Sequence, residues 1–200
     1  MGSLKNKILI SMPHMADPYF SKAVVYICEH NKDGAMGMII NKQFKEPDLK
    51  GLFEKLYIGD DAIHSLVNDI FFGGPVLLER GIVLHDAIYE SEGTIQLSDH
   101  ISMTSQQYVL KELQEKPDIQ FKLMLGHSGW GQRQLEREIE NGDWLMQNTT
   151  RDFIFNVEPE QMWQQATGSL GIDMGPSMGI GGQADSTLKR SGSSIKTDFY

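Results

Sequence analysis

Runs of β-branched and aliphatic residues alternate with turn-forming residues at the start of the chain. Such runs occupy residues 8–12, 24–30 and 36–41, and each is typical of a strand with a buried face. The second and third runs are separated by Asn31-Lys32-Asp33-Gly34, whose Asp-Gly pair tolerates the backbone angles of a tight reversal. The pattern therefore predicts one strand followed by a β-hairpin.

Apolar residues then adopt the spacing of one face of a helix. Asp48 is placed as an N-cap for a predicted helix that carries Leu49, Leu52, Phe53 and Leu56. Three further helices are predicted: one carrying Val109, Leu110 and Leu113 that ends at Pro117, a charged one over 132–141 that ends at Gly142, and one from Pro159 to Gly171 with Met162, Trp163, Ala166 and Leu170 in one stripe.

The remaining apolar runs predict strands. They are residues 70–72, halted by Gly73-Gly74-Pro75; 82–85, after a turn at Glu79-Arg80-Gly81; a strand ending at 102–104; 121–125; and 152–157, with Phe153, Phe155 and Val157 on one face. Several strands and about four helices without regular alternation favour a single α+β domain over residues 1–172. From residue 173 glycine and serine dominate, so 173–200 is predicted to be a disordered tail.

Composition narrows the classes of function. The formal charge is −9 and the Lys and Arg residues are dispersed, which disfavours direct binding to nucleic acid. Cys28, the only cysteine, lies in a predicted strand, so we expect a buried hydrophobe in a reducing compartment and no disulfide. No apolar stretch is long enough for a membrane span, and a cytosolic protein is expected.

Residues 126–131, Gly-His-Ser-Gly-Trp-Gly, lie between a predicted strand and a predicted helix, where hydrolases hold a nucleophilic serine. However, Trp130 stands where that elbow needs glycine, and no histidine follows His127 to complete a triad. We interpret the segment as a tight turn on which Trp130 packs. An alternative is that its free N–H groups, with Arg133, bind an anion.

The other candidates are sheet-end residues. Gly73-Gly74-Pro75 is interpreted as a reversal that could also adjoin a ligand, and His85-Asp86 closes a strand. The six histidines show no metal-binding spacing, so neither a metal nor a cofactor is predicted. The candidate ligand-binding residues are Gly73, Gly74, Pro75, His85, Asp86, His127, Ser128, Gly129, Trp130 and Arg133.

Five segments resemble the bacterial AlgH/YqgE family, in order and without a missing block between about residues 4 and 172. They are Ser11-Met12-Pro13-His14-Met15-Ala16-Asp17-Pro18-Tyr19-Phe20, residues 24–30, Gly34-Ala35-Met36-Gly37-Met38-Ile39-Ile40-Asn41-Lys42, Phe72-Gly73-Gly74-Pro75-Val76, and Gly129-Trp130-Gly131 through Gln134-Leu135-Glu136. The resemblance implies a complex α+β fold, with a bifurcated sheet and a small barrel portion surrounded by helices. It also implies a bacterial cytosolic location and the family's label of transcriptional regulator, but no defined reaction.

Two positions depart from the family pattern. Ser128 stands where members often have alanine, which argues against a nucleophile there. Gly181-Gly182-Gln183-Ala184 is followed by extra residues where the family usually has a short ending.

The leading hypothesis is a non-enzymatic binding or regulatory protein. It would hold an unknown partner protein or a small anionic ligand in loops that gather at the sheet rim. The alternative is a hydrolase that uses His127 with Ser128, or with His85 and Asp86 brought close by folding.

Overall fold

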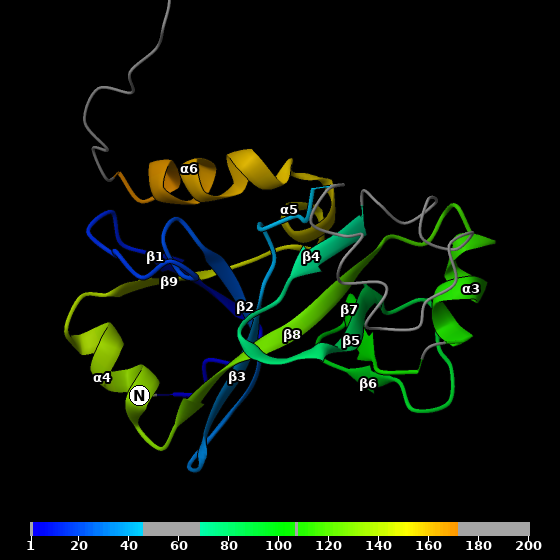
Figure 1. Ribbon diagram of the computed structural model, residues 1–200, viewed down its shortest axis with the longest axis horizontal. Helices are drawn as coiled ribbons and strands as arrows, with labels where there is room; N and C mark the ends of the chain where they lie inside the picture. Colours follow the sequence, from blue (N-terminus) through cyan, green and yellow to red (C-terminus); the bar gives the residue numbers. More distant parts are fainter. Residues whose placement is uncertain (1, 46–68, 107, 172–200) are drawn as a thin grey trace, which may run out of the picture.

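The computed structural model describes residues 2–45, 69–106 and 108–171 (Figure 1). Within these ranges, nine strands form one curled, open sheet, a half-barrel that is accompanied by four helices. The strands are β1 (Lys7–Ser11), β2 (Val24–Asn31), β3 (Gly34–Ile39), β4 (Ile70–Phe72), β5 (Val76–Asp86), β6 (Ile95–Gln96), β7 (Ile101–Thr104), β8 (Phe121–Gly131) and β9 (Trp144–Asn148). The helices are α3 (Tyr108–Gln114), α4 (Gln134–Glu140), α5 (Arg151–Asn156) and α6 (Pro159–Ser169).

The long strand β8 joins the two parts of the sheet. The strand order is β6-β7-β5-β8-β3-β2-β1-β9, with β4 beside β8. The first half of β8 pairs antiparallel with β5 and parallel with β4, and its last four residues pair with β3. The sheet therefore branches at β8, which confirms the expected α+β class.

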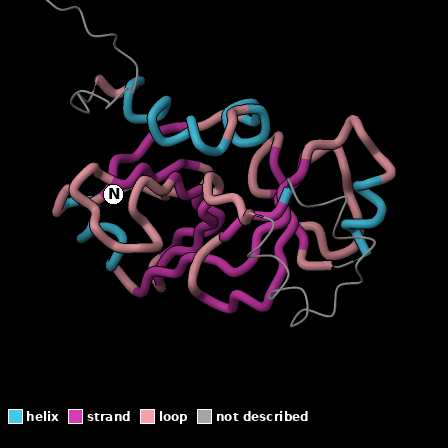
Figure 2. The backbone as a smooth tube through the Cα atoms, turned by 45° about the horizontal axis from the view of Figure 1, so that its top comes forward, coloured by secondary structure: helices cyan, strands magenta, loops and turns pink. Residues whose placement is uncertain are grey.

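Three apolar clusters hold the helices on the sheet. The largest lies against α5 and α6 and includes Tyr26, Met124 and Trp163, and Trp163 Nε1 also donates to the Ser11 carbonyl at 2.8 Å. A second cluster packs under α3, and a third packs under α4. Figure 2 shows the long helical segment along one side of the strands, and Figure 1 places α3 and α4 at opposite ends. Burying each large side chain contributes about 1.5–3 kcal/mol, so these clusters fix the helices firmly.

The early elements follow the sequence pattern. β2 and β3 form the predicted antiparallel hairpin, with Lys32 and Asp33 in the turn and Gly34 as the first residue of β3, opposite Asn31. A Cβ at Gly34 would lie 2.1 Å from the Trp130 carbonyl oxygen, so the start of β3 needs glycine for close packing against β8. Cys28 is buried, as predicted, and burial raises the pKa of its thiol to about 12.

The prediction of a strand at 152–157 is wrong, because these residues belong to helix α5 and the turn after it. Thr150 Oγ accepts a hydrogen bond from Phe153 N at 3.2 Å and caps the helix. Phe153, Phe155 and Val157 nevertheless pack against the largest apolar cluster, so their shared burial arises without strand geometry. The strand β9 just before them was missed.

Two predicted turns are also wrong. Residues 79–81 form an irregularity inside the long strand β5, and residues 126–131 continue β8. In α6, Met162, Trp163 and Ala166 are buried as predicted, but Leu170 is the C-cap residue and is exposed. The predicted helix at 49–56 and the predicted tail at 173–200 lie outside the described residues. No helix in the described ranges has the length and hydropathy needed to cross a bilayer.

Candidate functional site

The predicted Gly73-Gly74-Pro75 turn connects β4 to β5 and lies directly on β8. Gly73 N donates to the Leu125 carbonyl at 2.8 Å, and the Gly73 carbonyl accepts from Ser128 Oγ at 3.2 Å. A Cβ on Gly73 would lie 2.3 Å from the Gly126 carbonyl oxygen, and one on Gly74 would lie 2.3 Å from the His127 carbonyl. At both positions the turn lies so close to the backbone of β8 that any side chain would clash with it, so both residues must be glycine.

The second half of β8 carries the Gly-His-Ser-Gly-Trp-Gly motif in extended form. Its backbone is paired with β3 and, at His127, with Val76 of β5. Gly126 has φ +69°, and a Cβ there would lie 2.4 Å from the Gly74 carbonyl oxygen, so the glycine accommodates a sheet irregularity and not a reversal. The motif is therefore continuous with the strand, and its last residue, Gly131, donates its N–H to Gln134 Oε1 at 3.0 Å.

His127 and Ser128 are neighbours on β8 and therefore point to opposite faces of the sheet. Ser128 is fully buried, and its hydroxyl donates to the Gly73 carbonyl. His127 is half-buried, and burial, followed by the charge of Arg80, lowers the pKa of its imidazole. Within the described residues, the structure thus gives Ser128 a carbonyl partner and no histidine partner.

His85 and Asp86 end β5, beside the first residues of β8. His85 pairs with Phe121, and the six-residue interval to His127 corresponds to about 20 Å along β8. The His85 ring is buried, its Nδ1 donates to the Asp86 carbonyl at 2.8 Å, and its Nε2 has no partner among the described residues. Burial lowers the pKa of His85, and the bond to Asp86 partly opposes that change.

The Asp86 carboxylate is a structural anchor. It accepts both Nε and Nη2 of Arg151, the latter at 2.6 Å, and it also accepts Gln120 N at 3.0 Å. Such a two-pronged pair fixes both side chains in place. Asp86 therefore connects the end of β5 to the start of β8 and to α5.

Trp130 and Arg133 complete the predicted set. Trp130 is buried in the cluster under α4, and its Nε1 donates to Glu138 Oε2 at 2.9 Å. Arg133 is exposed, has φ +54°, and precedes α4 at its N-cap position. The predicted residues thus fall into two groups, one along the second half of β8 and one formed by His85 and Asp86, and they do not share one recess.

Two exposed apolar residues lie beside the group on the second half of β8 and were not among the residues predicted from the sequence. Val76 is 39 % exposed and Leu77 is 43 % exposed, and Leu77 has φ +49°. We name this region the corner surface and define it by Pro75, Val76, Leu77, His127 and Gly129. A signal was present in the sequence, since two apolar residues directly after Gly-Gly-Pro cannot both face the core of a regular strand.

A polar pocket of about 470 Å³ lies near the second group. It is lined by Asn6, Tyr26, and residues 98–101 and 149–152. No sequence signal links these residues, because four distant segments meet only when the sheet curls. Arg151 lines this pocket while it holds Asp86.

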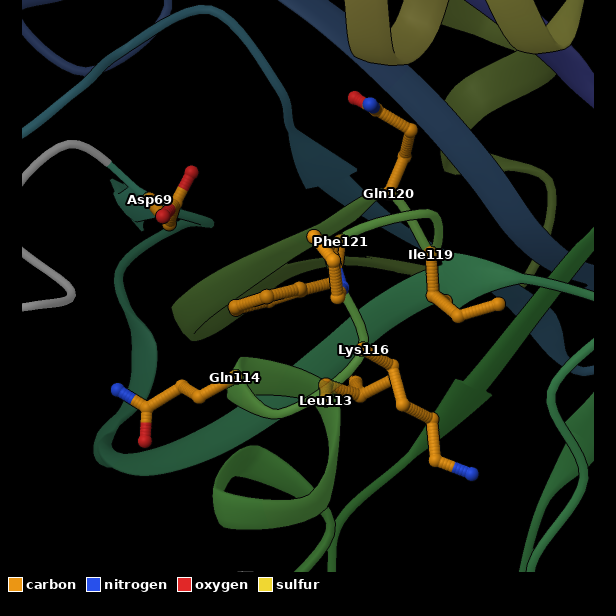
Figure 3. A pocket seen from close by; sticks show the side chains of 8 residues that line it. Asp69, Leu113, Gln114, Lys116, Ile119, Gln120 and Phe121 are labelled. Carbon is orange, nitrogen blue, oxygen red and sulfur yellow. The ribbon is translucent and has the colours of Figure 1, made fainter.

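A smaller hollow of about 300 Å³ lies between α3 and the start of β8. Figure 3 shows Asp69 and Gln114 on one side of Phe121, with Ile119 on the other and the Lys116 side chain pointing away from Asp69. The Lys116 ammonium lies over the Tyr89 ring, 5.3 Å from its centre. None of the predicted site residues lines this hollow, and no cluster of potential metal ligands occurs in the described ranges.

Comparison with known proteins places the chain in a family. The AlgH-like family model matches residues 8–175. A UPF0301 protein of Shewanella frigidimarina is 40% identical over 177 residues, which cover 87% of this chain and 95% of that protein. A UPF0301 protein of Cupriavidus pinatubonensis is 39% identical over 183 residues, covering 91% and 96%.

Two solved structures share the fold. The solution structure of the AlgH protein from Pseudomonas aeruginosa aligns with TM-score 0.69 and 32% identity, over 87% of this chain and 94% of that one. A crystal structure of a Corynebacterium diphtheriae protein aligns with TM-score 0.62 at 17% identity, over 84% and 88%, which concerns the fold alone. Family model, relatives and structure agree: the chain belongs to the AlgH-like family.

Proposed function

We propose that this protein is a non-enzymatic regulatory protein that acts by binding a partner protein through the corner surface. The observation that carries the proposal is Leu77. It is a bulky, exposed residue held in the left-handed backbone region. For a residue with a Cβ this conformation costs about 1–2 kcal/mol. Since the exposed side chain recovers little of that cost by packing, a role at an interface accounts for it best.

The backbone under the corner surface is rigid. Gly73 and Gly74 lie within backbone contact of β8, and Val76 is paired with His127. A contact surface that is already ordered loses little conformational entropy on binding. Val76 and Leu77 would then act as anchors, and Arg80 supplies a cation beside His127. We expect a partner with a shallow apolar recess and acidic residues at its rim.

The hydrolase hypothesis has less support. Ser128 Oγ is buried and donates to a backbone carbonyl, and the His85 ring is buried at the opposite end of β8. A nucleophile needs a base within hydrogen-bond reach and access for substrate. Neither residue meets both conditions in this geometry.

Substituting Leu77 by glycine tests partner binding without reducing the stability of the fold. Leu77→Gly removes the contact side chain at a position whose φ angle glycine adopts freely. We expect the variant to unfold at the same urea concentration as the wild type or higher, with a gain of up to about 1 kcal/mol. We also expect its affinity for the partner to fall by at least about tenfold.

The partner is found by placing a photocrosslinking amino acid at residue 77 in cells. Ile88, which is 77% exposed near the other end of β5, is the matched control position. The proposal is supported if the crosslinker at residue 77 forms one covalent adduct with a partner protein and the crosslinker at residue 88 does not form it. The adduct should also be lost when Val76→Asp is added. Support also requires binding of the purified partner that Leu77→Gly weakens and Ile88→Gly does not. Equal adducts from both positions, or full affinity in Leu77→Gly, would refute the proposal.

A further inference from the structure

The polar pocket forms where the two ends of the curled sheet meet. Residues 98–101 lead from β6 into β7 at one end of the strand order, whereas Asn6 directly precedes β1, and residues 149–152 lead from β9 into α5, at the other end. Its volume of about 470 Å³ lies within the range of pockets that bind small molecules. The pocket is distinct from the corner surface, because Asp86 and His127 lie near opposite ends of β8.

The walls of the pocket are held in place before any ligand binds. Arg151 is fixed by its two-pronged bond to Asp86, and Tyr26 Oη donates to Asn6 Oδ1 at 3.0 Å. Thr150 is fixed by its cap bond to Phe153 N. Buried Tyr26 and Ile101 form the apolar part of the lining. A ligand would therefore meet a pre-ordered site, which favours binding.

The charges around the pocket favour a positive ligand group. Arg151 is the cation of the lining, and it is already bonded to Asp86 and to Asp152 Oδ1. Asp99 also lines the pocket and makes no ion pair in the described part of the chain. The pocket is thus lined by two carboxylates, one guanidinium and the imidazole of His100, while the buried Asp86 carboxylate lies outside the lining and pairs with Arg151. Because Arg151 already serves Asp86 and Asp152, the unpaired Asp99 carboxylate favours an ammonium group over a phosphate group.

The uncharged lining supplies hydrogen bonds. The Ser98 hydroxyl accepts from His100 N at 3.3 Å and can still donate, and the Thr149 hydroxyl donates to the Thr150 carbonyl and can still accept. The Asn6 amide keeps its N–H groups because its oxygen accepts from Tyr26. Hydroxyl and amide groups can both donate and accept, so they suit a ligand that carries hydroxyls of its own. We propose that this pocket binds a small polar molecule with an ammonium group and hydroxyl groups and without phosphate. The ammonium group would lie by Asp99, and the hydroxyls would face Ser98 and Thr149.

Three related sugars test the proposed chemistry. Glucosamine carries an ammonium and hydroxyls, glucose lacks the ammonium, and glucose 6-phosphate adds an anion. With isotope-labelled full-length protein, millimolar glucosamine should shift the amide resonances of residues 98–101 and 149–152. Glucose should bind more weakly, and glucose 6-phosphate more weakly still. Added salt should reduce the difference between the three probes, because exposed charges are screened.

Substitutions locate the site. Asp99→Asn should weaken glucosamine binding by about threefold and leave glucose binding unchanged. Asp33→Asn removes the same charge from the distant β2–β3 turn and should leave both unchanged. Asp99 is exposed, so unchanged resonances elsewhere will verify the fold of the variant. Tighter binding of glucose 6-phosphate, shifts outside the pocket, equal effects of both substitutions, or no shifts with glucosamine would overturn the proposal.

Discussion

Lys122 is a buried lysine whose charge has few compensating contacts. It is 5% exposed, its Nζ donates to the Ile40 carbonyl at 3.1 Å, and the ammonium lies 4.3 Å from the centre of the Phe71 ring. Burial lowers the pKa of the amine to about 8, although Asp69 and Glu158 partly oppose that change. The gap from 10.5 to about 8 corresponds to about 3 kcal/mol of destabilisation near pH 7.

The sign of the pH dependence follows from proton binding. Between about pH 8 and 10.5, Lys122 holds more protons in the unfolded chain than in the folded one, so stability rises with pH there. Lys122→Met should lose that rise. We expect its stability relative to wild type to fall by about 2–3 kcal/mol between pH 7 and pH 10 in urea unfolding. The exposed Lys111→Met is the control, and parallel curves for wild type and Lys122→Met would contradict the interpretation.

At the scale of elements, one carboxylate holds α4 against the sheet. Glu138 Oε2 accepts the indole N–H groups of Trp130 and Trp144, each at 2.9 Å, and Oε1 accepts Gln134 Nε2 at 2.9 Å. Both tryptophans are buried, and Glu138 is the described hydrogen-bond partner of both indole N–H groups. Helix α4 is therefore fixed to β8 and to β9 by one side chain.

Glu138→Ala should leave two buried indole donors unpaired. We expect a loss of about 2–4 kcal/mol in the free energy of unfolding, together with a change in tryptophan fluorescence of the folded protein. Glu138→Gln, which keeps an acceptor oxygen, should cost less. Glu140→Ala on the same helix changes an exposed residue and serves as control. If both alanine variants unfold at the same urea concentration, the contacts of Glu138 contribute little.

The sequence predicted correctly those elements that are determined by neighbouring residues, such as turn residues and regularly spaced apolar residues. The β2–β3 hairpin and α6 follow from turn residues and from apolar spacing, and the structure confirms both. Helix α5 was predicted as a strand because its six residues are too few to show helical spacing, and the cap at Thr150 decides the outcome. β8 was cut at Gly126 because glycine usually signals a turn, whereas here close packing against Gly74 requires it.

The candidate site was less predictable than the fold. The sequence marked Gly73-Gly74-Pro75 and the segment with His127 and Ser128 separately, by their glycines. Only the pairing of the strands shows that the two segments are in contact. The polar pocket depends on the curl of the whole sheet, which no single segment encodes. The sequence signal at Val76 and Leu77 shows that one of the two must face away from the core, but the positive φ of Leu77 is visible only in the structure.

At the scale of the whole molecule, the Asp86–Arg151 pair connects parts of the chain that are 65 residues apart. Asp86 is 2% exposed, so removing its partner leaves a buried carboxylate with Gln120 N as its remaining described donor. Arg151→Met should therefore lower the free energy of unfolding by about 3–5 kcal/mol. Asp86→Asn combined with Arg151→Met should cost less than the sum of the single changes.

Urea unfolding of the two single variants and the double variant measures this coupling. Arg137→Met changes an exposed arginine of α4 and controls for the loss of a positive charge. Additive costs in the cycle would mean that the pair does not couple the end of β5 to α5.

The pairing of β1 also constrains when the chain can fold during synthesis. β1 lies between β2 and β9, with Lys7 opposite Asn148, and its residues Ile8, Leu9 and Ile10 are fully buried. Among the described strands, β1 is synthesised first and β9 last, so the second edge of β1 stays uncovered until β9 has been made. A nascent chain that stalls before β9 would display an apolar strand with an open edge, which is a template for aggregation.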